Sequence, residues 1–230
     1  MNNVFASSIT AGIVLSLAGY EIGLLLKKKF KYALLNPLLI SIIFVMGFLL
    51  IFKVDYESYN SSARYLSYLL TPATVSLAIP LYEQLELLKK NFKAIIIGIM
   101  SGVVTSLSTI FLLSVLFRLS HSEYVTLLPK SITTAIGIGL SEEMGGIVTI
   151  TVATIIVTGV LGNIIAESIC KVFSIKNPIS RGLAIGTSAH AVGTARAMEM
   201  GEIEGAMSSL AIVVAGLLTV IGASVFQMFI

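Results

Sequence analysis

Ionisable side chains within an apolar stretch are the residues of this sequence best placed to do chemistry. The richest run is residues 186–199, in which His190, Thr194, Arg196 and Glu199 stand among alanines and glycines. In a helix His190 and Thr194 would share a face at i,i+4, and Arg196 and Glu199 would be neighbours at i,i+3. Ionisable groups are costly inside a membrane and usually mark function. We interpret the run as a site for a small, polar and anionic ligand.

Each of these residues also has a purely structural interpretation. Arg196 and Glu199 could pair only with each other at the membrane edge, and His190 could be a hydrogen-bonded structural histidine.

A half-helix that begins near Thr187 or Ser188 would present free N–H groups, which suit an anion. The sequence alone leaves these alternatives open.

Hydroxyl side chains beside prolines mark two further runs. Lys130 follows Pro129, and it either snorkels outward to water or faces the cavity as a charge that attracts anions. The hydroxyls either satisfy broken backbone or contact the ligand. The hydroxyl candidates are Thr74, Ser76, Ser131, Thr133, Thr134 and Ser188. Candidates for proton coupling are Glu142, Glu143 and Glu199, although carboxylates at a membrane boundary could simply be solvated.

No set of nucleophile, base and orienting group can be assembled from these residues, so we do not expect an enzyme. The sequence lacks HExxH and GxxxxGK[ST] patterns, which speaks against a metallohydrolase and an ATP-driven pump. Cys170 is the only cysteine, which excludes an internal disulfide and disfavours a zinc cluster. We therefore predict no metal and no cofactor.

The composition indicates what positions these residues. Of the 230 residues 56% are hydrophobic and only 12% are charged, where soluble domains have about 25% charged residues. The mean hydropathy is +0.98 and the net charge is +3. These values exclude disordered, collagen-like and nucleic-acid-binding classes and leave a helical protein that spans a lipid bilayer several times.

Roughly 20 apolar residues cross a bilayer as a helix, and five stretches meet this condition. They are Phe5–Leu26, Tyr32–Phe52, Ala94–Phe117, Met144–Ala166 and Gly205–Ile230. Three further apolar stretches are interrupted by proline, glycine or charge. They are Tyr65–Tyr82, Tyr124–Ser141 and Gly182–Met200.

Basic residues cluster at 27–31, 89–93 and 171–181. The positive-inside rule places these clusters in the cytoplasm and the N-terminus outside. Residues 124–145 must then dip into the membrane and return on the same side. Residues 182–201 either dip in from the cytoplasm or cross as a broken helix. We favour the dip, which leaves the C-terminus outside.

The interrupted stretches also resemble one another. Leu70–Pro80 and Leu127–Gly137 share proline, alternating hydroxyl residues and Ala-Ile before a breaker. Ala135–Gly145 and Ala191–Gly201 share a small-apolar-glycine start and a Glu-Met-Gly end. Chance matches among common membrane residues are the alternative. If the second and third stretches dip from opposite faces, they form an inverted pair whose tips meet at a transporter-like binding site.

The run Ser180–Ala197 and its continuation to Leu210 resemble the LrgB/CidB family of bacterial membrane proteins. Leu70–Val75 with Pro80–Tyr82, and Leu128–Thr134, are similar to two further hallmarks of that family and keep their order. The resemblance implies a multi-pass protein of the bacterial cytoplasmic membrane. It covers nearly the whole chain, so we predict a single LrgB-like domain over residues 1–230.

The resemblance implies two alternative functions. One is secondary transport of small monocarboxylates such as pyruvate or glycolate, alone or with a small LrgA/CidA-type membrane protein as partner. The other is an antiholin-like regulator of murein hydrolases and cell lysis, acting as a membrane interaction or pore protein. Broken, polar and repeated segments favour the first, and a homo-oligomer is left open.

We therefore expect an all-α integral membrane protein with about five full spans, three broken or re-entrant segments and an internal inverted repeat. The residues expected to bind the carboxylate are Thr74, Ser76, Lys130, Ser131, Thr133, Thr134, Ser188, His190, Thr194 and Arg196.

Overall fold

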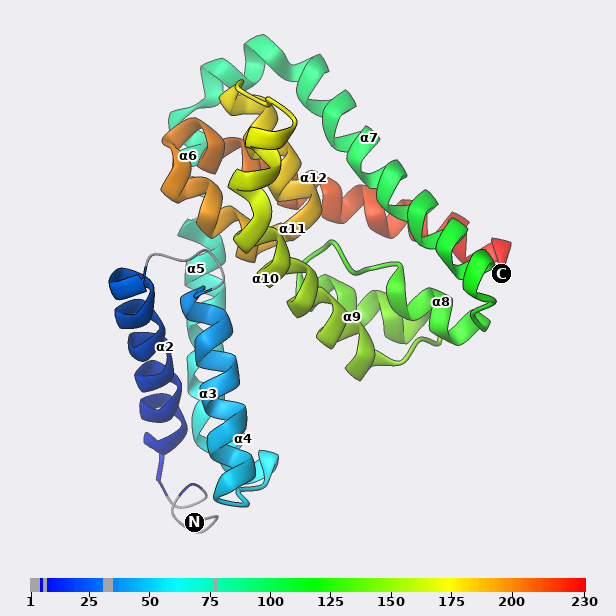
Figure 1. Cartoon of the computed structure of the whole chain (residues 1–230). Coiled ribbons are helices and arrows are strands. Elements are labelled where there is room, and N and C mark those ends of the chain that lie inside the picture. Colours follow the sequence, from blue (N-terminus) through cyan, green and yellow to red (C-terminus); the bar gives the residue numbers. More distant parts are fainter. Residues whose placement is uncertain (1–4, 6–7, 31–34, 77) are drawn as a thin grey trace. The chain divides into compact units, whose positions relative to one another are not determined.

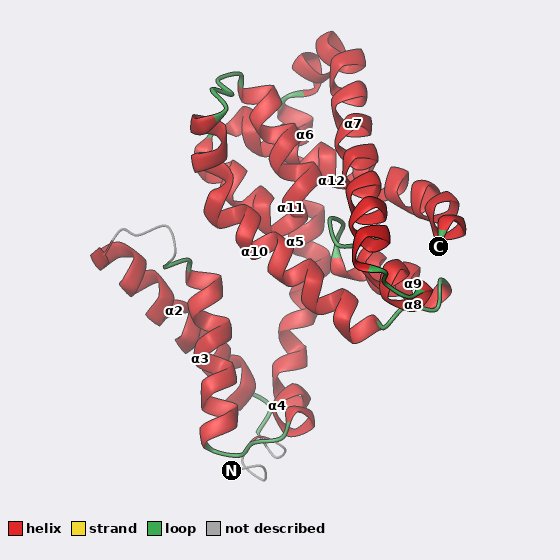
Figure 2. Cartoon of the chain, turned by 45° about the vertical axis from the view of Figure 1, so that its right-hand side comes forward, coloured by secondary structure: helices red, strands yellow, loops and turns green. Residues whose placement is uncertain are grey.

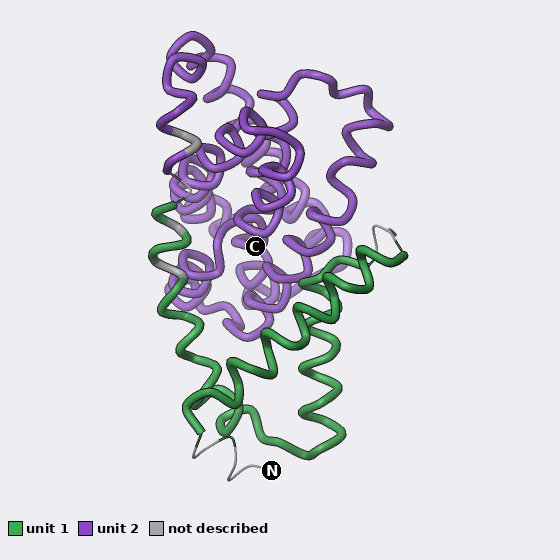
Figure 3. Tube along the Cα trace, turned by 90° about the vertical axis from the view of Figure 1, so that its left-hand side faces the viewer, with its two compact units in different colours: residues 1–76 green, residues 77–230 purple. Residues whose placement is uncertain are grey.

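The structure is a computed structural model of the chain, and it describes residue 5 and residues 8–30, 35–76 and 78–230. Every secondary-structure element in these ranges is a helix (Figure 2). The described chain therefore confirms the predicted all-α class. It divides into two compact units, residues 1–76 and residues 77–230 (Figure 3).

Two longer helices in contact with each other, α2 and α3, make up most of the first unit (Figure 1). Asn36 accepts hydrogen bonds from the amides of Leu38 and Leu39 at 2.9 and 3.3 Å, and this capping starts α3. Gly23 lets the two helices approach, since a Cβ there would lie 2.7 Å from the Pro37 Cα. The elements of this unit are α2 (Ala11–Phe30), α3 (Pro37–Ile51), α4 (Tyr56–Ala63), η1 (Arg64–Leu69) and α5 (Leu70–Ser76).

Three helices of the second unit are long and apolar enough to cross a membrane. They are α7 (Leu85–Phe117), α10 (Val148–Val172) and α12 (Glu202–Phe226), which continues as the short helix η2 (Gln227–Phe229). They coincide with the predicted spans Ala94–Phe117, Met144–Ala166 and Gly205–Ile230. Helices α7 and α10 are longer than their predictions because helix continues past the apolar stretch into charged residues.

The predicted count of five spans is not confirmed. The stretch predicted at Phe5–Leu26 overlaps α2, and its residues 6 and 7 lie outside the described residues. The stretch predicted at Tyr32–Phe52 overlaps α3, which has 15 residues, and its residues 32–34 lie outside the described residues. In the part of the chain that is described, three helices meet the condition.

The second interrupted stretch forms a helical hairpin, hairpin A, made of α8 (His121–Leu127), a loop at residues 128–133 and α9 (Thr134–Glu143). Its two ends meet, because the Ser122 hydroxyl donates to the Gly145 carbonyl at 3.2 Å. The Thr126 hydroxyl likewise accepts from the Ile147 amide at 2.7 Å. The chain thus reverses direction within residues 121–145.

The third interrupted stretch, α11 (Pro178–Met200), also turns back on itself. His190 has φ 42° and ψ −140°, which is not helical. A Cβ on Gly193 would lie 3.0 Å from Cγ2 of Ile185, eight residues earlier, whereas a straight helix rises about 12 Å over that length. This segment is therefore a second hairpin, hairpin B, with its tip at His190.

The two hairpins approach α10 from its opposite ends. Ser141 and Thr126 of hairpin A bond Thr151 near the start of α10, at 2.7 and 2.9 Å. Arg196 of hairpin B pairs with Glu167 near the end of α10. The tips meet its middle, where the His190 ring reaches the Ile155 carbonyl at 3.0 Å. These contacts establish opposed placement; they do not confirm the predicted internal repeat.

Hairpin B packs closely on α12 because two glycines of α11 face that helix. A Cβ on Gly182 would lie 2.5 Å from the Glu204 carbonyl oxygen, and one on Gly186 would overlap the Ser208 carbonyl. Small residues allow such close helix approach in membranes. The far end of α12 lies beside α8, where the Tyr124 hydroxyl donates to the Phe226 carbonyl at 2.9 Å (Figure 1).

The first interrupted stretch, Tyr65–Tyr82, is also broken in the structure. It is divided among η1, α5 and α6 (Ala78–Glu83), and Leu77 lies outside the described residues. Helix α6 contacts α12 in the second unit.

Candidate functional site

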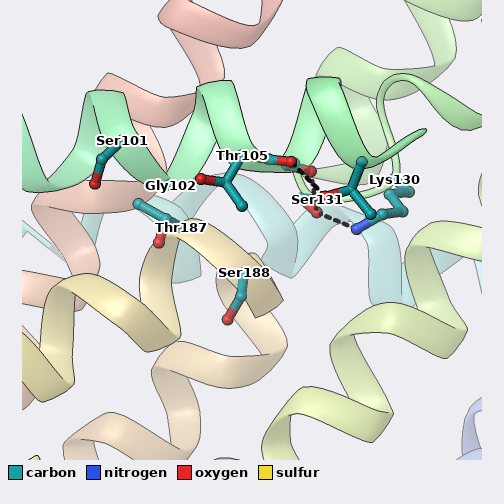
Figure 4. A pocket seen from close by; sticks show the side chains of 9 residues that line it. Ser101, Gly102, Thr105, Lys130, Ser131, Thr187 and Ser188 are labelled. Carbon is teal, nitrogen blue, oxygen red and sulfur yellow. Dashed lines mark hydrogen bonds between the residues drawn. The ribbon is translucent and has the colours of Figure 1, made fainter. Parts of the chain in front are cut away.

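A pocket of about 380 Å³ lies where the tips of both hairpins face α7 (Figure 4). We call it the polar pocket after the serine, threonine and lysine residues that line it, although most of its surface is apolar. Helix α7 passes both tips, and it contributes one wall. The loop of hairpin A and the first half of α11 contribute the others. The lining residues are Ser101, Gly102, Thr105, Ser106, Thr109, Lys130, Ser131, Thr187 and Ser188.

Lys130 supplies the charge of this pocket. Its ammonium group donates to the Ser131 hydroxyl at 2.9 Å, and that hydroxyl is 3.3 Å from the Ser106 hydroxyl on α7 (Figure 4). Among the described residues no carboxylate oxygen lies within 4.0 Å of Lys130 Nζ. A cation in a membrane-embedded pocket without a counter-charge favours an anionic ligand.

Four of the other hydroxyls of the pocket, those of Ser101, Thr109, Thr187 and Ser188, bond to their own helices. The Thr187 and Ser188 hydroxyls donate to the Leu183 and Ala184 carbonyls, both at 2.7 Å. Ser101 donates in the same way to the Gly98 carbonyl at 2.8 Å. These hydroxyls present lone pairs to the pocket until they rotate, and rotation of a hydroxyl needs no backbone movement. Lys130 is thus the main donor available to an anion.

Three of the predicted ligand residues line this pocket, namely Lys130, Ser131 and Ser188. Thr133 and Thr134 do not line it; they begin α9 beside it. Thr133 occupies the N-cap position, and its side chain makes no capping hydrogen bond. The prediction that a half-helix begins near Thr187 or Ser188 is wrong, because both lie within the first half of α11 and the break comes at His190.

Two predicted ligand residues, Thr74 and Ser76, belong to α5 in the first unit. The Ser76 hydroxyl is exposed and donates to the Ala73 carbonyl at 2.7 Å. The Thr74 side chain lies outside the described side chains. Neither is among the residues that line the pocket.

The hydroxyls of α7 were missed by sequence reasoning. Ser101, Thr105 and Thr109 recur at intervals of four within an apolar span, which puts them on one helix face. That periodic polar face was the available signal. Ser106 lies one position away and meets Ser131 of the loop.

His190 and Thr194 hold the tip of hairpin B in place. His190 is buried, and its Nε2 lies 3.0 Å from the Ile155 carbonyl oxygen, which makes Nε2 the protonated nitrogen. Gly159 leaves room for the ring, since a Cβ there would lie 2.6 Å from Cε1. Thr194 donates to the His190 carbonyl at 2.9 Å and bonds Ser208 of α12 at 2.7 Å. Neither residue lines the polar pocket.

Arg196 lies in a separate charged cavity of about 330 Å³ at the base of hairpin B. It pairs with Glu167 of α10 and, at 2.5 Å, with Glu199, and Lys171 also pairs with Glu167 at 2.8 Å. Two carboxylates therefore already compensate its charge.

The carboxylates proposed for coupling are placed apart. Glu142 and Glu143 are exposed at the end of α9, whereas Glu199 belongs to the charged cavity. In the described part of the chain no three His, Cys, Asp or Glu side chains gather in a way that would hold a metal ion.

Asn163, deep in α10, donates to the Val192 carbonyl of α11 at 2.7 Å.

Comparison with known proteins gives one family and a consistent set of relatives. The model of the LrgB-like family matches residues 16–229. A Bacillus subtilis (strain 168) protein named "Antiholin-like protein LrgB" is 42% identical over 216 residues, which is 94% of each chain. A Bacillus cereus (strain B4264) protein of the same name is 39% identical over 228 residues, covering 98% of this chain and 99% of its own. No solved structure matches the chain.

Proposed function

The chain belongs to the LrgB-like family, and from this membership we propose that it serves the cell as an antiholin-like membrane protein. The name that its relatives share supports this role better than it supports carboxylate transport. In this role the chain would restrain murein hydrolases and cell lysis from the bacterial cytoplasmic membrane, acting through a small LrgA/CidA-type partner.

For the molecular activity behind that role, we propose that the polar pocket binds a small monocarboxylate and passes it across the membrane. The observation that carries this proposal is Lys130, a cation with no carboxylate within 4.0 Å among the described residues, at the meeting point of two hairpin tips. Broken helices that meet inside a transmembrane bundle are typical of transporter binding sites.

The ligand's carboxylate would sit between Lys130 and the start of α9. The first N–H groups of α9 follow Thr133, which gives them no side-chain cap. The positive end of a helix dipole there adds to the attraction for an anion. The Ser131 and Ser188 hydroxyls would rotate to donate to the second carboxylate oxygen.

Movement would come from the hairpins, which we propose form an inverted pair. One is held at the start of α10 and the other at its end, so release of either base would open the pocket to one side. Arg196, Glu167 and Glu199 would close the base of hairpin B, and protonation of a carboxylate there would loosen it. In this scheme residues 1–230 form one LrgB-like domain, and its N-terminus lies outside.

Uptake of labelled pyruvate into proteoliposomes tests the transport proposal. Wild type, Lys130→Gln and Lys176→Gln would be compared under an imposed proton gradient, with and without an LrgA-type partner. We expect saturable uptake that Lys130→Gln reduces at least tenfold and Lys176→Gln leaves unchanged, because Lys176 is exposed and outside the pocket. Leakage of small dyes without saturable uptake would contradict a carrier and favour a pore.

A lysis assay separates the two levels of the proposal. Wild type and Lys130→Gln would be expressed at equal levels in a strain that lacks its own copy, and autolysis would be followed by optical density. If lysis control depends on anion binding, only wild type should delay autolysis. Equal delay by both would leave the antiholin-like role standing without the pocket.

A further inference from the structure

A second cavity begins at Lys130 and runs away from the polar pocket. It lies between α10 and the first half of α11 and has a volume of about 410 Å³. Lys130 and Ser188 line both cavities, so the two meet at these side chains. The remaining lining residues are Thr158, Leu161, Gly162, Ile165, Ala166, Ile169, Cys170, Ile175, Ala184 and Ile185.

This groove is polar at one end and apolar along the rest. Lys130, Thr158 and Ser188 form the polar end, at the level where the hairpin tips meet. From Thr158 to Cys170 it follows α10 for about 18 Å at 1.5 Å per residue. The length and volume of the groove suit a hydrocarbon chain. A two- or three-carbon acid would be far too short to fill it.

The groove is accessible from the surface that faces lipid. Leu161, Ile165 and Ile169 form one wall, and they are 52%, 45% and 42% exposed. Its far end borders the charged cavity, because Cys170 lines both. A chain lying in the groove would therefore end where the charged cavity begins.

We propose that this site also binds an anionic amphiphile, a carboxylate with an alkyl chain, whose head group pairs with Lys130 and whose chain lies in the groove between α10 and α11. This inference rests on the proposed anion site at Lys130 and adds a second class of ligand to it. Charge complementarity selects the occupant. A cation with no carboxylate partner among the described residues ends an apolar groove, and a carboxylate with an alkyl chain satisfies both.

Chain length gives the expected signature. Each methylene buried in the groove should tighten binding about fourfold, until the chain reaches Cys170. Acetate and pyruvate should bind weakly, and decanoate should bind far more tightly. A neutral alcohol of the same length fills the groove without pairing with Lys130.

Cys170 provides the readout, because it is the only cysteine in the chain and lies at the far end of the groove. Its rate of labelling by a maleimide would be measured in phosphatidylcholine vesicles with acetate, decanoate, hexadecanoate or 1-hexadecanol. The sixteen-carbon chain is used because ten extended carbons fall short of the groove's length of about 18 Å. We expect hexadecanoate to slow labelling at least tenfold and acetate not at all. Lys130→Gln should remove the advantage of hexadecanoate over 1-hexadecanol, and Lys176→Gln should retain it.

Two variants keep the result decisive. If the buried thiol reacts too slowly, Ile169→Cys in a Cys170→Ala background places the reporter on the exposed wall of the groove. Ala184→Phe narrows the groove on an exposed face of α11, and it should remove the gain with chain length while acetate binding remains.

The outcomes separate this inference from the proposed function. Binding of labelled acetate that depends on Lys130, with no gain from longer chains and no protection, would overturn the amphiphile and retain the anion site. Absence of any Lys130-dependent binding would overturn both. Protection by phosphatidylglycerol vesicles without added carboxylate, reversed by Lys130→Gln, would identify the occupant as a membrane lipid and overturn the free acid.

Discussion

Two basic side chains of similar sequence context have opposite surroundings. Lys130 donates to one serine hydroxyl and has no carboxylate within 4.0 Å among the described residues. Arg196 contacts two carboxylates at the base of hairpin B. A charge kept in a membrane pocket without a partner is a cost to folding, whereas a charge in an ion-pair network stabilises. From this contrast we propose that Lys130 serves ligand recognition and that Arg196 serves the architecture of hairpin B.

Substitution by methionine should therefore act with opposite signs at these two positions. Lys130→Met removes an uncompensated charge and should leave stability unchanged or raise it by about 1 kcal/mol. Arg196→Met leaves Glu167 and Glu199 facing each other and should lower stability by about 1 kcal/mol. Thermal unfolding in detergent measures both. A loss of stability in Lys130→Met would mean that this lysine is structural.

At the scale of elements, both hairpins depend on short breaks in otherwise helical segments. The break in hairpin A coincides with Pro129, which lacks an N–H and cannot donate the next helical hydrogen bond, although Leu128 before it keeps helical dihedral angles. The break in hairpin B has no such local cause, because it falls at His190. There the ring's bond to the Ile155 carbonyl and the space at Gly159 hold the backbone.

The variants His190→Gly and His190→Ala should differ in thermal stability, and the sign of the difference reports this break. With φ at 42°, alanine pays a left-handed backbone cost of about 1–2 kcal/mol that glycine avoids. Both variants lose the ring, so their difference isolates the backbone. We expect His190→Gly to unfold at a higher temperature than His190→Ala. The reverse order, by about 1 kcal/mol, is what a continuous helix would give.

The packing of hairpin B against α12 makes a second prediction at this scale. A methyl group on Gly186 would overlap the Ser208 carbonyl, which is backbone and cannot rotate away. Gly186→Ala should cost about 1–3 kcal/mol. Gly139→Ala is the matched control, because nothing lies within 4 Å of its Cβ position in α9, and it should be neutral or stabilising. Equal stability of the two variants would contradict the close approach.

The same elements show how far sequence reasoning reaches. Apolar length located α7, α10 and α12, and interruption by proline, glycine and charge located the segments that turn back. The hydroxyls of α7 escaped notice because a polar stripe inside an apolar span looks like backbone satisfaction. Residues far apart in sequence, such as Ser106 and Ser131, share a pocket only through tertiary contacts. The spacing of apolar and polar residues along the sequence carries no information about such contacts.

At the scale of the whole molecule, the second unit has two distinct ends. The base of hairpin A and the end of α12 lie together at one, where Tyr124 donates to the Phe226 carbonyl. The base of hairpin B and the start of α12 lie at the other end, where Nη1 of Arg181 is 3.7 Å from Oε1 of Glu204. By the positive-inside rule, the basic residues near 171–181 predict that the second end faces the cytoplasm.

Cysteine accessibility in intact cells tests this orientation. In a Cys170→Ala background, Ser122→Cys places a thiol at the base of hairpin A, and Lys176→Cys places one before hairpin B; both positions are exposed or partly exposed. A membrane-impermeant thiol reagent should label Ser122→Cys in whole cells and Lys176→Cys only after permeabilisation. Labelling of both from outside would show that hairpin B's base faces the same side. The opposed hairpins, and a pocket opened alternately at each base, would then both be excluded.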